Sequence, residues 1–152
     1  MLKISGTGWA KISIDNQVVY TGSYLTDIPC DFMKALYDYC SKDEIEERDC
    51  RRSSSVYVDS EGGVANFVFS DMIYSQNDQK VFMFYSGKNG WEFKAFNADP
   101  VDLTKELVRD IESDFENWVE WYCNEKEPAK KAARDNLSYW LNKLKEIIAI
   151  IK

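Results

Sequence analysis

Short apolar runs separated by turn sequences occupy the chain from Val56 to Phe96, and they constrain the fold more than any other feature. The runs are SVYVD, VANFVFSDMIY, KVFMFYS and WEFKAF, and the sequences SEGG, SQNDQ and GKNG divide them. Their length and their content of aromatic and β-branched residues are typical of strands. Because such short connections join neighbouring strands as hairpins, the region predicts an antiparallel sheet.

The dipeptide Asn89-Gly90 sets the expected register of the last hairpin. It is a strong signal for a two-residue type I′ turn, because both central residues of that turn need a positive φ. With this turn, Lys88 faces Trp91 and Phe84 faces Ala95. One side of the hairpin then carries Phe82, Phe84, Trp91 and Phe93. The other side is also apolar, so the sheet is either covered on both faces or keeps one face for a partner.

The first part of the chain predicts a hairpin followed by a helix. GWAKISI alternates apolar and polar residues, and the sequence DN turns the chain into QVVYTGSY. TDIPCDFMKALYDYC has apolar residues at helical spacing, with Pro29 in the first turn and Asp27 and Asp31 at the positive helix start. The charged segment SKDEIEERDCRRSSS, residues 41–55, is expected to form a loop that leaves room for a helical turn at 43–48.

The last third predicts two helices. The first opens with Asp99 as its N-cap and Pro100 as its first residue, and it continues to a stop at Asn124. The second runs from Pro128 to Ile151, with apolar residues at steps of three and four. The short link between them predicts an antiparallel helical hairpin.

Together these segments predict one α+β domain over residues 1–152. The element order is β-β-α-β-β-β-β-α-α, with an antiparallel sheet of about six strands packed against the C-terminal helical hairpin. The chain is 45% hydrophobic, which is enough for a core of its own. No segment reaches the ~18 apolar residues of a membrane span, and the first residues do not resemble a secretory signal. We therefore expect a cytoplasmic protein that does not contact membranes.

The residues that common catalytic and metal sites need are missing or scattered. The chain contains no histidine, which removes the usual general base and every Ser-His or Cys-His nucleophile. Its four cysteines, at 30, 40, 50 and 123, include no close pair, so we expect no metal, no cofactor and no enzyme activity. Asp71, inside an apolar run, marks a bulge or a strand end, or it is a buried functional acid. RDCRRSSS, residues 48–55, either pairs with neighbouring acids or holds a phosphate.

The net charge of −7 is unevenly distributed. Residues 101–123 carry seven acidic and two basic residues, whereas residues 124–152 carry seven basic and four acidic residues. An acidic surface disfavours direct binding to nucleic acid and to anionic membranes. It favours a basic protein partner, and self-association into a homodimer stays open.

The segment ESDFENWVEWYC combines acidic and aromatic residues on one predicted helix. At about 100° per residue, Phe115, Trp118 and Tyr122 share the stripe that faces the core. Trp121 lies about 120° from Phe115, so it either packs against the last helix or anchors a partner. The acids form either an ordinary solvated face or a surface for a basic protein. The predicted partner-binding residues are Trp121, Asp110, Asp114, Glu106, Glu120 and Asn117.

In size, acidity, α+β order and this acidic-aromatic helix, the chain resembles bacterial toxin-immunity proteins. The resemblance implies a non-catalytic immunity or inhibitor protein that neutralises a toxin, such as a basic nuclease, by direct binding. It includes no motif that assigns a role to an individual residue. The alternatives are a small-ligand cup formed by the two-sided aromatic sheet, and a phage-type inhibitor of a nucleic-acid enzyme.

Overall fold

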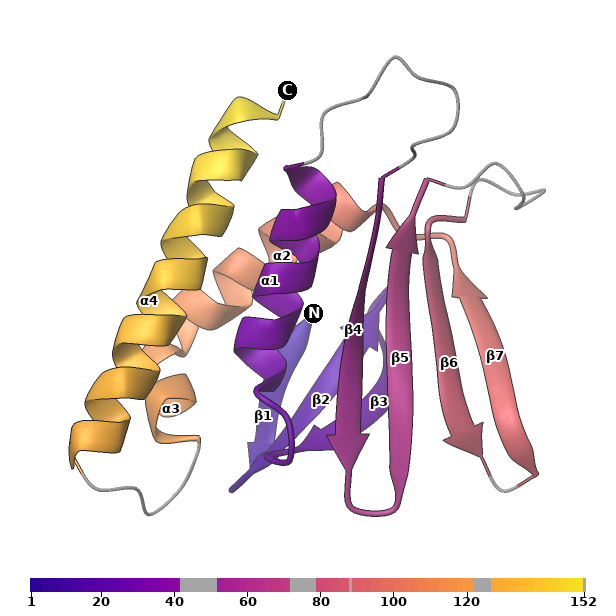
Figure 1. Cartoon of the computed structure of the whole chain (residues 1–152), viewed down its shortest axis with the longest axis horizontal. Coiled ribbons are helices and arrows are strands. Elements are labelled where there is room, and N and C mark those ends of the chain that lie inside the picture. Colours follow the sequence, from indigo (N-terminus) through magenta and orange to yellow (C-terminus); the bar gives the residue numbers. More distant parts are fainter. Residues whose placement is uncertain (42–51, 72–78, 88, 122–126, 152) are drawn as a thin grey trace.

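The computed structural model describes residues 1–41, 52–71, 79–87, 89–121 and 127–151 (Figure 1). These residues form an α+β fold, as predicted, with two antiparallel sheets and four helices. In chain order the elements are β1 (Leu2–Gly6), β2 (Trp9–Ile14), β3 (Gln17–Ser23), α1 (Ile28–Cys40), β4 (Ser53–Ser60), β5 (Gly63–Ser70), β6 (Val81–Gly87), β7 (Gly90–Phe96), α2 (Pro100–Ser113), α3 (Phe115–Glu120) and α4 (Glu127–Ile150).

The predicted single sheet of about six strands is corrected in two respects. The strands form a three-stranded sheet, β1-β2-β3, and a four-stranded sheet, β4-β5-β6-β7. The additional strand is β1, which pairs with β2 and whose five residues are too few to show a clear alternation in the sequence. Both sheets are antiparallel, as the short connections predict.

The two sheets meet where β3 approaches β4 closely. A Cβ atom added at Gly22 on β3 would lie 2.7 Å from the Val58 side chain on β4, so this contact needs a glycine. Tyr20, also on β3, reaches the four-stranded sheet through its hydroxyl, 3.0 Å from Ser60 Oγ, and through an edge-to-face contact with Phe67. The two sheets therefore share one core rather than forming separate units.

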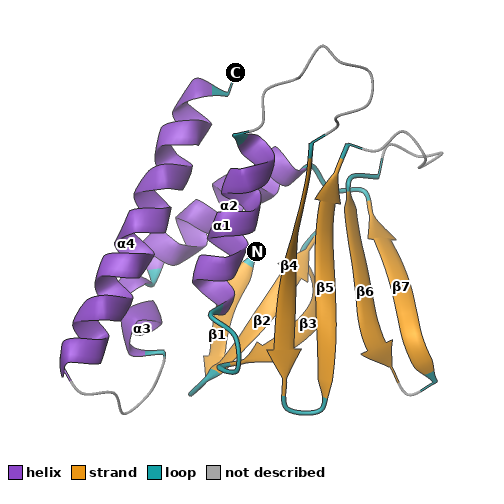
Figure 2. Cartoon of the chain, viewed as in Figure 1, coloured by secondary structure: helices purple, strands orange, loops and turns teal. Residues whose placement is uncertain are grey.

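Helix α1 forms as its sequence predicts and covers the inner face of the four-stranded sheet. The Asp27 side chain accepts a hydrogen bond from the Cys30 N–H, and Pro29 lies in the first turn. The side chain of Phe32 packs against Phe67 and Phe69 on β5, with ring centroids 5.3 and 6.4 Å apart. In Figure 1, α1 lies between α4 and β4, and in Figure 2 all the helices lie on one side of the four-stranded sheet.

Two local predictions around the four-stranded sheet are corrected. Strand β4 begins at Ser53, so the end of the predicted 41–55 loop is a strand; residues 42–51 lie outside the described part. The β6-β7 hairpin closes at Gly87 and Gly90, one residue earlier than Asn89-Gly90 predicts. Phe84 therefore faces Phe93 instead of Ala95. Because the partner of each residue moves by two positions, every side chain keeps its predicted face.

The C-terminal helices start where predicted, but the first of them is broken. The side chain of Asp99 accepts a hydrogen bond from the Val101 N–H at 2.7 Å, and Pro100 opens α2. Asp114 then leaves the helical conformation, with φ −134° and ψ 28°, and divides the predicted helix into α2 and α3. The predicted stop at Asn124 lies outside the described residues. Three helices thus replace the predicted pair, with α4 packed on α2 and α3.

We predict that Phe67→Ala lowers the free energy of unfolding by about 3–5 kcal/mol, because the buried ring touches both α1 and β3. Phe93→Ala removes an aromatic ring from the same sheet, but that ring is exposed, so a loss below about 1 kcal/mol is expected. Urea denaturation of both variants measures the difference. Equal losses would show that the core is not where the structure places it.

Candidate functional site

The acids of α2 and α3 lie opposite the basic residues of α4. Glu116 forms a bidentate ion pair with Arg134, with both N···O distances 2.6 Å. These hydrogen bonds lower the pKa of Glu116. Glu112 pairs with Lys145 at 2.6 Å, and Glu120 pairs with Lys130 at 3.2 Å. The excess of acids at 101–123 and the excess of bases at 124–152 are therefore largely paired within the molecule. This helix surface does not present one sign of charge.

Three of the predicted partner-binding residues surround one surface hollow. Glu106, Asp110 and Asp114 line a space of about 670 Å³ between α2 and the first two strands. The carboxylate of Asp110 accepts a hydrogen bond from the Leu2 N–H at 3.0 Å and contacts the amino group of Met1. These contacts tie β1 to α2 and leave Asp110 half-buried.

The other predicted polar residues, Asn117 and Glu120, belong to α3. The amide of Asn117 donates a hydrogen bond to Asp114 at 2.5 Å, and Glu120 contacts Lys130. Neither residue lines the hollow, so the structure divides the predicted set between two places. Contact of these polar residues with a partner stays a prediction.

Trp121, the predicted aromatic anchor of this surface, is buried, with only 3% of its surface exposed. Its indole N–H donates a hydrogen bond to the Trp9 carbonyl at 3.3 Å, and its ring lies 5.7 Å from that of Trp118. Trp121 is therefore buried, and its hydrogen bond joins it to β2 rather than to the last helix. The helical wheel contains the signal, because Leu103 and Leu107 on the same flank are buried as well.

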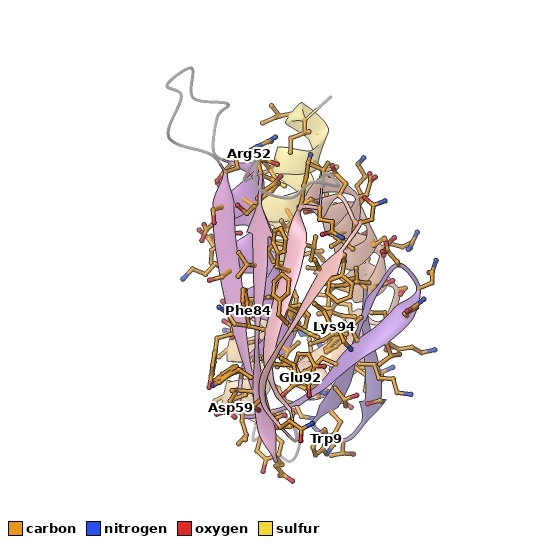
Figure 3. All side chains as sticks on the ribbon, turned by 90° about the vertical axis from the view of Figure 1, so that its right-hand side faces the viewer. Trp9, Arg52, Asp59, Phe84, Glu92 and Lys94 are labelled. Carbon is orange, nitrogen blue, oxygen red and sulfur yellow. The ribbon has the colours of Figure 1, made fainter. Side chains whose placement is uncertain are left out.

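Four exposed aromatic side chains share the outer face of the four-stranded sheet. Their exposed fractions are 52% for Tyr57, 42% for Phe84, 70% for Trp91 and 55% for Phe93. The strand register places Tyr57, Asn66, Phe84 and Phe93 in one row across the sheet, and the rings of Phe84 and Phe93 lie 5.0 Å apart. Figure 3 looks onto these strands, and no helix lies in front of them. We call these four residues the aromatic face.

Sequence reasoning predicts most of this surface. Phe82, Phe84, Trp91 and Phe93 share one side of the β6-β7 hairpin, as the alternation predicts. Phe82 is more covered than the others and stacks on Phe93, with 6.0 Å between ring centroids. Tyr57 on β4 could have been found only with the strand order, because two strands separate it from Phe93.

Two carboxylates lie beside the aromatic face without a partner of opposite charge in the described part of the chain. Asp59 is on β4, in the same row as Trp91, and Glu61 lies in the β4-β5 turn. Neither side chain makes an ion pair or hydrogen bond with another described residue. Their charge is free to act on an approaching molecule, in contrast to the paired acids of α3.

Asp71, singled out in the sequence, directly follows strand β5, which ends at Ser70. Its carboxylate accepts hydrogen bonds from the Tyr39 hydroxyl at 2.5 Å and from Arg52 Nε at 2.7 Å, and it lies 3.7 Å from Lys80 Nζ. Burial by itself raises the pKa of Asp71, but these hydrogen bonds and positive charges outweigh it and lower the pKa. The pKa of Tyr39 is raised by burial and by the same hydrogen bond. The cluster joins α1, β4 and the end of β5.

The described residues contain neither a candidate metal-binding cluster nor a candidate membrane-spanning helix. They contain no group of three or more carboxylate, cysteine or histidine ligands close enough to hold a metal ion. Cys30 and Cys40 are buried free thiols. None of the described helices combines the length and hydrophobicity needed to cross a bilayer.

Neither a protein-family model, nor a curated protein, nor a solved structure matches this chain. The resemblance to toxin-immunity proteins therefore stays a prediction. Function has to be inferred from the surfaces of the chain itself, of which the aromatic face is the most distinctive.

We predict that Asp71→Asn lowers the free energy of unfolding by about 1–3 kcal/mol at neutral pH, because charged hydrogen bonds to Arg52 and Tyr39 are lost. The folded-state pKa of Asp71 is depressed, so its contribution is complete above pH ~4 and disappears as the pH falls through the folded value. The difference between variant and wild type should therefore shrink in acid. Urea denaturation at several pH values measures it, and a constant difference would contradict this account.

Trp121→Ala should lower the free energy of unfolding by about 3–5 kcal/mol, because a buried ring and its hydrogen bond are removed. The neighbouring change Glu120→Gln removes only an exposed ion pair and should cost about 0–1 kcal/mol. Thermal and urea unfolding of the two variants checks this contrast. A fully stable Trp121→Ala protein would show that Trp121 is not part of the core.

Proposed function

We propose that the protein is a non-catalytic binding module that attaches to another protein through the aromatic face. The observation that carries this proposal is the exposure of Tyr57, Phe84, Trp91 and Phe93 together on one sheet face that no other described element covers. Exposed apolar surface of this kind is costly in water, and contiguous patches of it mark interaction sites.

The composition and shape of the aromatic face favour a protein as the partner. Tyrosine and tryptophan provide large contact areas and are enriched among the residues that dominate protein–protein affinity. Side chains that enclose a small ligand would surround a cavity, whereas these four are exposed on one face of the sheet, on strands β4, β6 and β7. Asn66, in the same row as Tyr57 and Phe84, adds a polar group that can orient the partner.

The charges around the aromatic face favour a basic partner. Asp59 and Glu61 lie at its margin and have no ion-pair partner among the described residues. The chain as a whole carries a net charge of −7, which attracts a basic protein from a distance. More specifically, we propose an immunity or inhibitor protein that neutralises a basic toxin, such as a nuclease, by covering the surface through which the toxin acts.

The test begins with capture of the partner on the tagged full-length chain, followed by binding measurements with both purified proteins. Trp91→Ser/Phe93→Ser should weaken binding by about 100-fold or more, because two exposed anchors are removed. The matched control is Tyr139→Ser, which removes a 55% exposed aromatic residue from α4 and should leave the affinity unchanged. Unchanged affinity of the double variant would overturn the proposal.

Charge reversal beside the aromatic face tests the attraction of a basic partner, and an assay of the partner's activity tests the inhibitory role. Asp59→Lys/Glu61→Lys should weaken binding about tenfold in low salt and less in high salt, because screening reduces the contribution of exposed charges. If the protein is an inhibitor, adding it to the captured partner should abolish the partner's activity or its toxicity in cells. A partner that stays fully active in the complex would exclude the inhibitor role but leave the docking surface intact.

A further inference from the structure

Strand β7 forms a free edge of the four-stranded sheet. In the described part of the chain β7 pairs with β6 alone and is the last strand of its sheet. Its residues from Gly90 to Lys94 are exposed, including those that point toward the inner face. A free edge offers unpaired N–H and C=O groups to another strand. The side chains along β7 decide which strand can use them.

The hydrogen-bond pattern shows which backbone groups of β7 point outward. The Ser70 N–H donates to the Lys80 carbonyl, and hydrogen-bonded pairs then recur at every second residue. Tyr85 and Met83 on β6 therefore direct their backbone groups toward β7, where they face Glu92 and Lys94. The backbone groups of Trp91, Phe93 and Ala95 consequently point away from β6, toward the free edge.

We propose that β7 pairs through this edge with β7 of a second copy, antiparallel and centred on Phe93, so that two molecules form one continuous sheet. Phe93 then lies opposite Phe93 of the second copy as a hydrogen-bonded pair. Trp91 lies opposite Ala95 of the second copy, and Glu92 lies opposite Lys94 of the second copy. The arrangement is symmetric, so each of the last two pairs occurs twice. This proposal does not depend on the proposed function.

Charge complementarity selects this register over its neighbours. Centred on Phe93, the pairing places two opposite charges against each other twice, at the Cβ separation of about 4.5–5.5 Å found in directly opposed pairs. Centred on Glu92, it would oppose two glutamates, and centred on Lys94 it would oppose two lysines. Like charges in directly opposed positions are destabilising. The sequence Glu-Phe-Lys is thus complementary to itself in one antiparallel register.

The neighbours of Glu92 and Lys94 on the inner face, and the side chain of Trp91 on the outer face, are compatible with this pairing. On the inner face, the Tyr85 hydroxyl holds Glu92 at 2.5 Å, and Lys94 Nζ lies 5.2 Å from the centre of the Tyr85 ring. Figure 3 shows Glu92 and Lys94 on the same strand. On the outer face, the large Trp91 would meet the small Ala95 of the second copy, so the exposed ring gains cover without a clash.

Charged residues on an edge strand usually prevent pairing with other chains. Glu92 and Lys94 disfavour pairing with most other strands, because a strand of unrelated sequence would leave at least one of these two charges without an opposite charge. A second copy in the two-fold register is the exception, because it supplies both missing charges. The edge therefore discriminates against other strands while admitting its own copy.

Reversal of one charge at a time, with sedimentation equilibrium from micromolar to millimolar protein, tests the proposal. Glu92→Lys and Lys94→Glu should each weaken self-association about tenfold or more, because each variant opposes like charges. An equimolar mixture of the two variants should associate again, to within about threefold of wild type, because every opposed pair is then one lysine and one glutamate. The double variant Glu92→Lys/Lys94→Glu should likewise associate with itself.

The controls separate this edge from general charge effects. Lys11→Glu on β2 and Asp135→Lys on α4 make charge changes of the same size at exposed positions away from β7 and should leave self-association unchanged. A wild-type protein that stays monomeric at all concentrations overturns the proposal. So does self-association that ignores both reversals, or single variants that fail to associate when mixed. Binding of a basic partner is measured separately, so its failure leaves this result unaffected.

Discussion

The packing of α1 against the inner face of β4 and β5 is the contact on which the rest of the structure depends. Phe32 fills the centre of that contact against Phe67 and Phe69. On its opposite side α1 meets α4, where the rings of Tyr37 and Trp140 lie 6.1 Å apart. Removing α1 would separate the helices from the four-stranded sheet, because no other helix has extensive contacts with β4 and β5.

Because α1 and the other helices occupy one side of the four-stranded sheet, its other face stays open. Antiparallel sheets commonly carry a solvated polar face opposite the core. Here that face carries Phe84, Trp91 and Phe93 instead, on the two strands farthest from α1. Local strand preference does not require rings of this size at exposed positions, since threonine or valine would serve a strand as well. The proposed contact with another protein would explain their presence.

Local sequence patterns predict much of the fold and of the aromatic face, and the other features depend on contacts between residues that are far apart in the sequence. The caps Asp27 and Asp99 and the shared face of the β6-β7 aromatic residues follow from adjacent residues alone. The packing of the two sheets against each other depends on the close approach at Gly22, which no periodicity reveals. The break at Asp114 interrupts a sequence whose apolar spacing continues without a gap. The hydrogen-bond partner of Trp121 is a carbonyl 112 residues away in the sequence.

Net charge is a poor guide to where a protein binds, because it does not show which charges are already paired. Residues 101–123 carry seven acids and two bases, yet Glu112, Glu116 and Glu120 each contact a basic residue of α4. Such exposed pairs add little stability, but they cancel the field that would steer a partner. Asp59 and Glu61, inconspicuous in the sequence, have no ion-pair partner among the described residues. Under the proposed function, a basic protein should therefore be attracted more strongly beside the aromatic face than over the paired acids of α2 and α3.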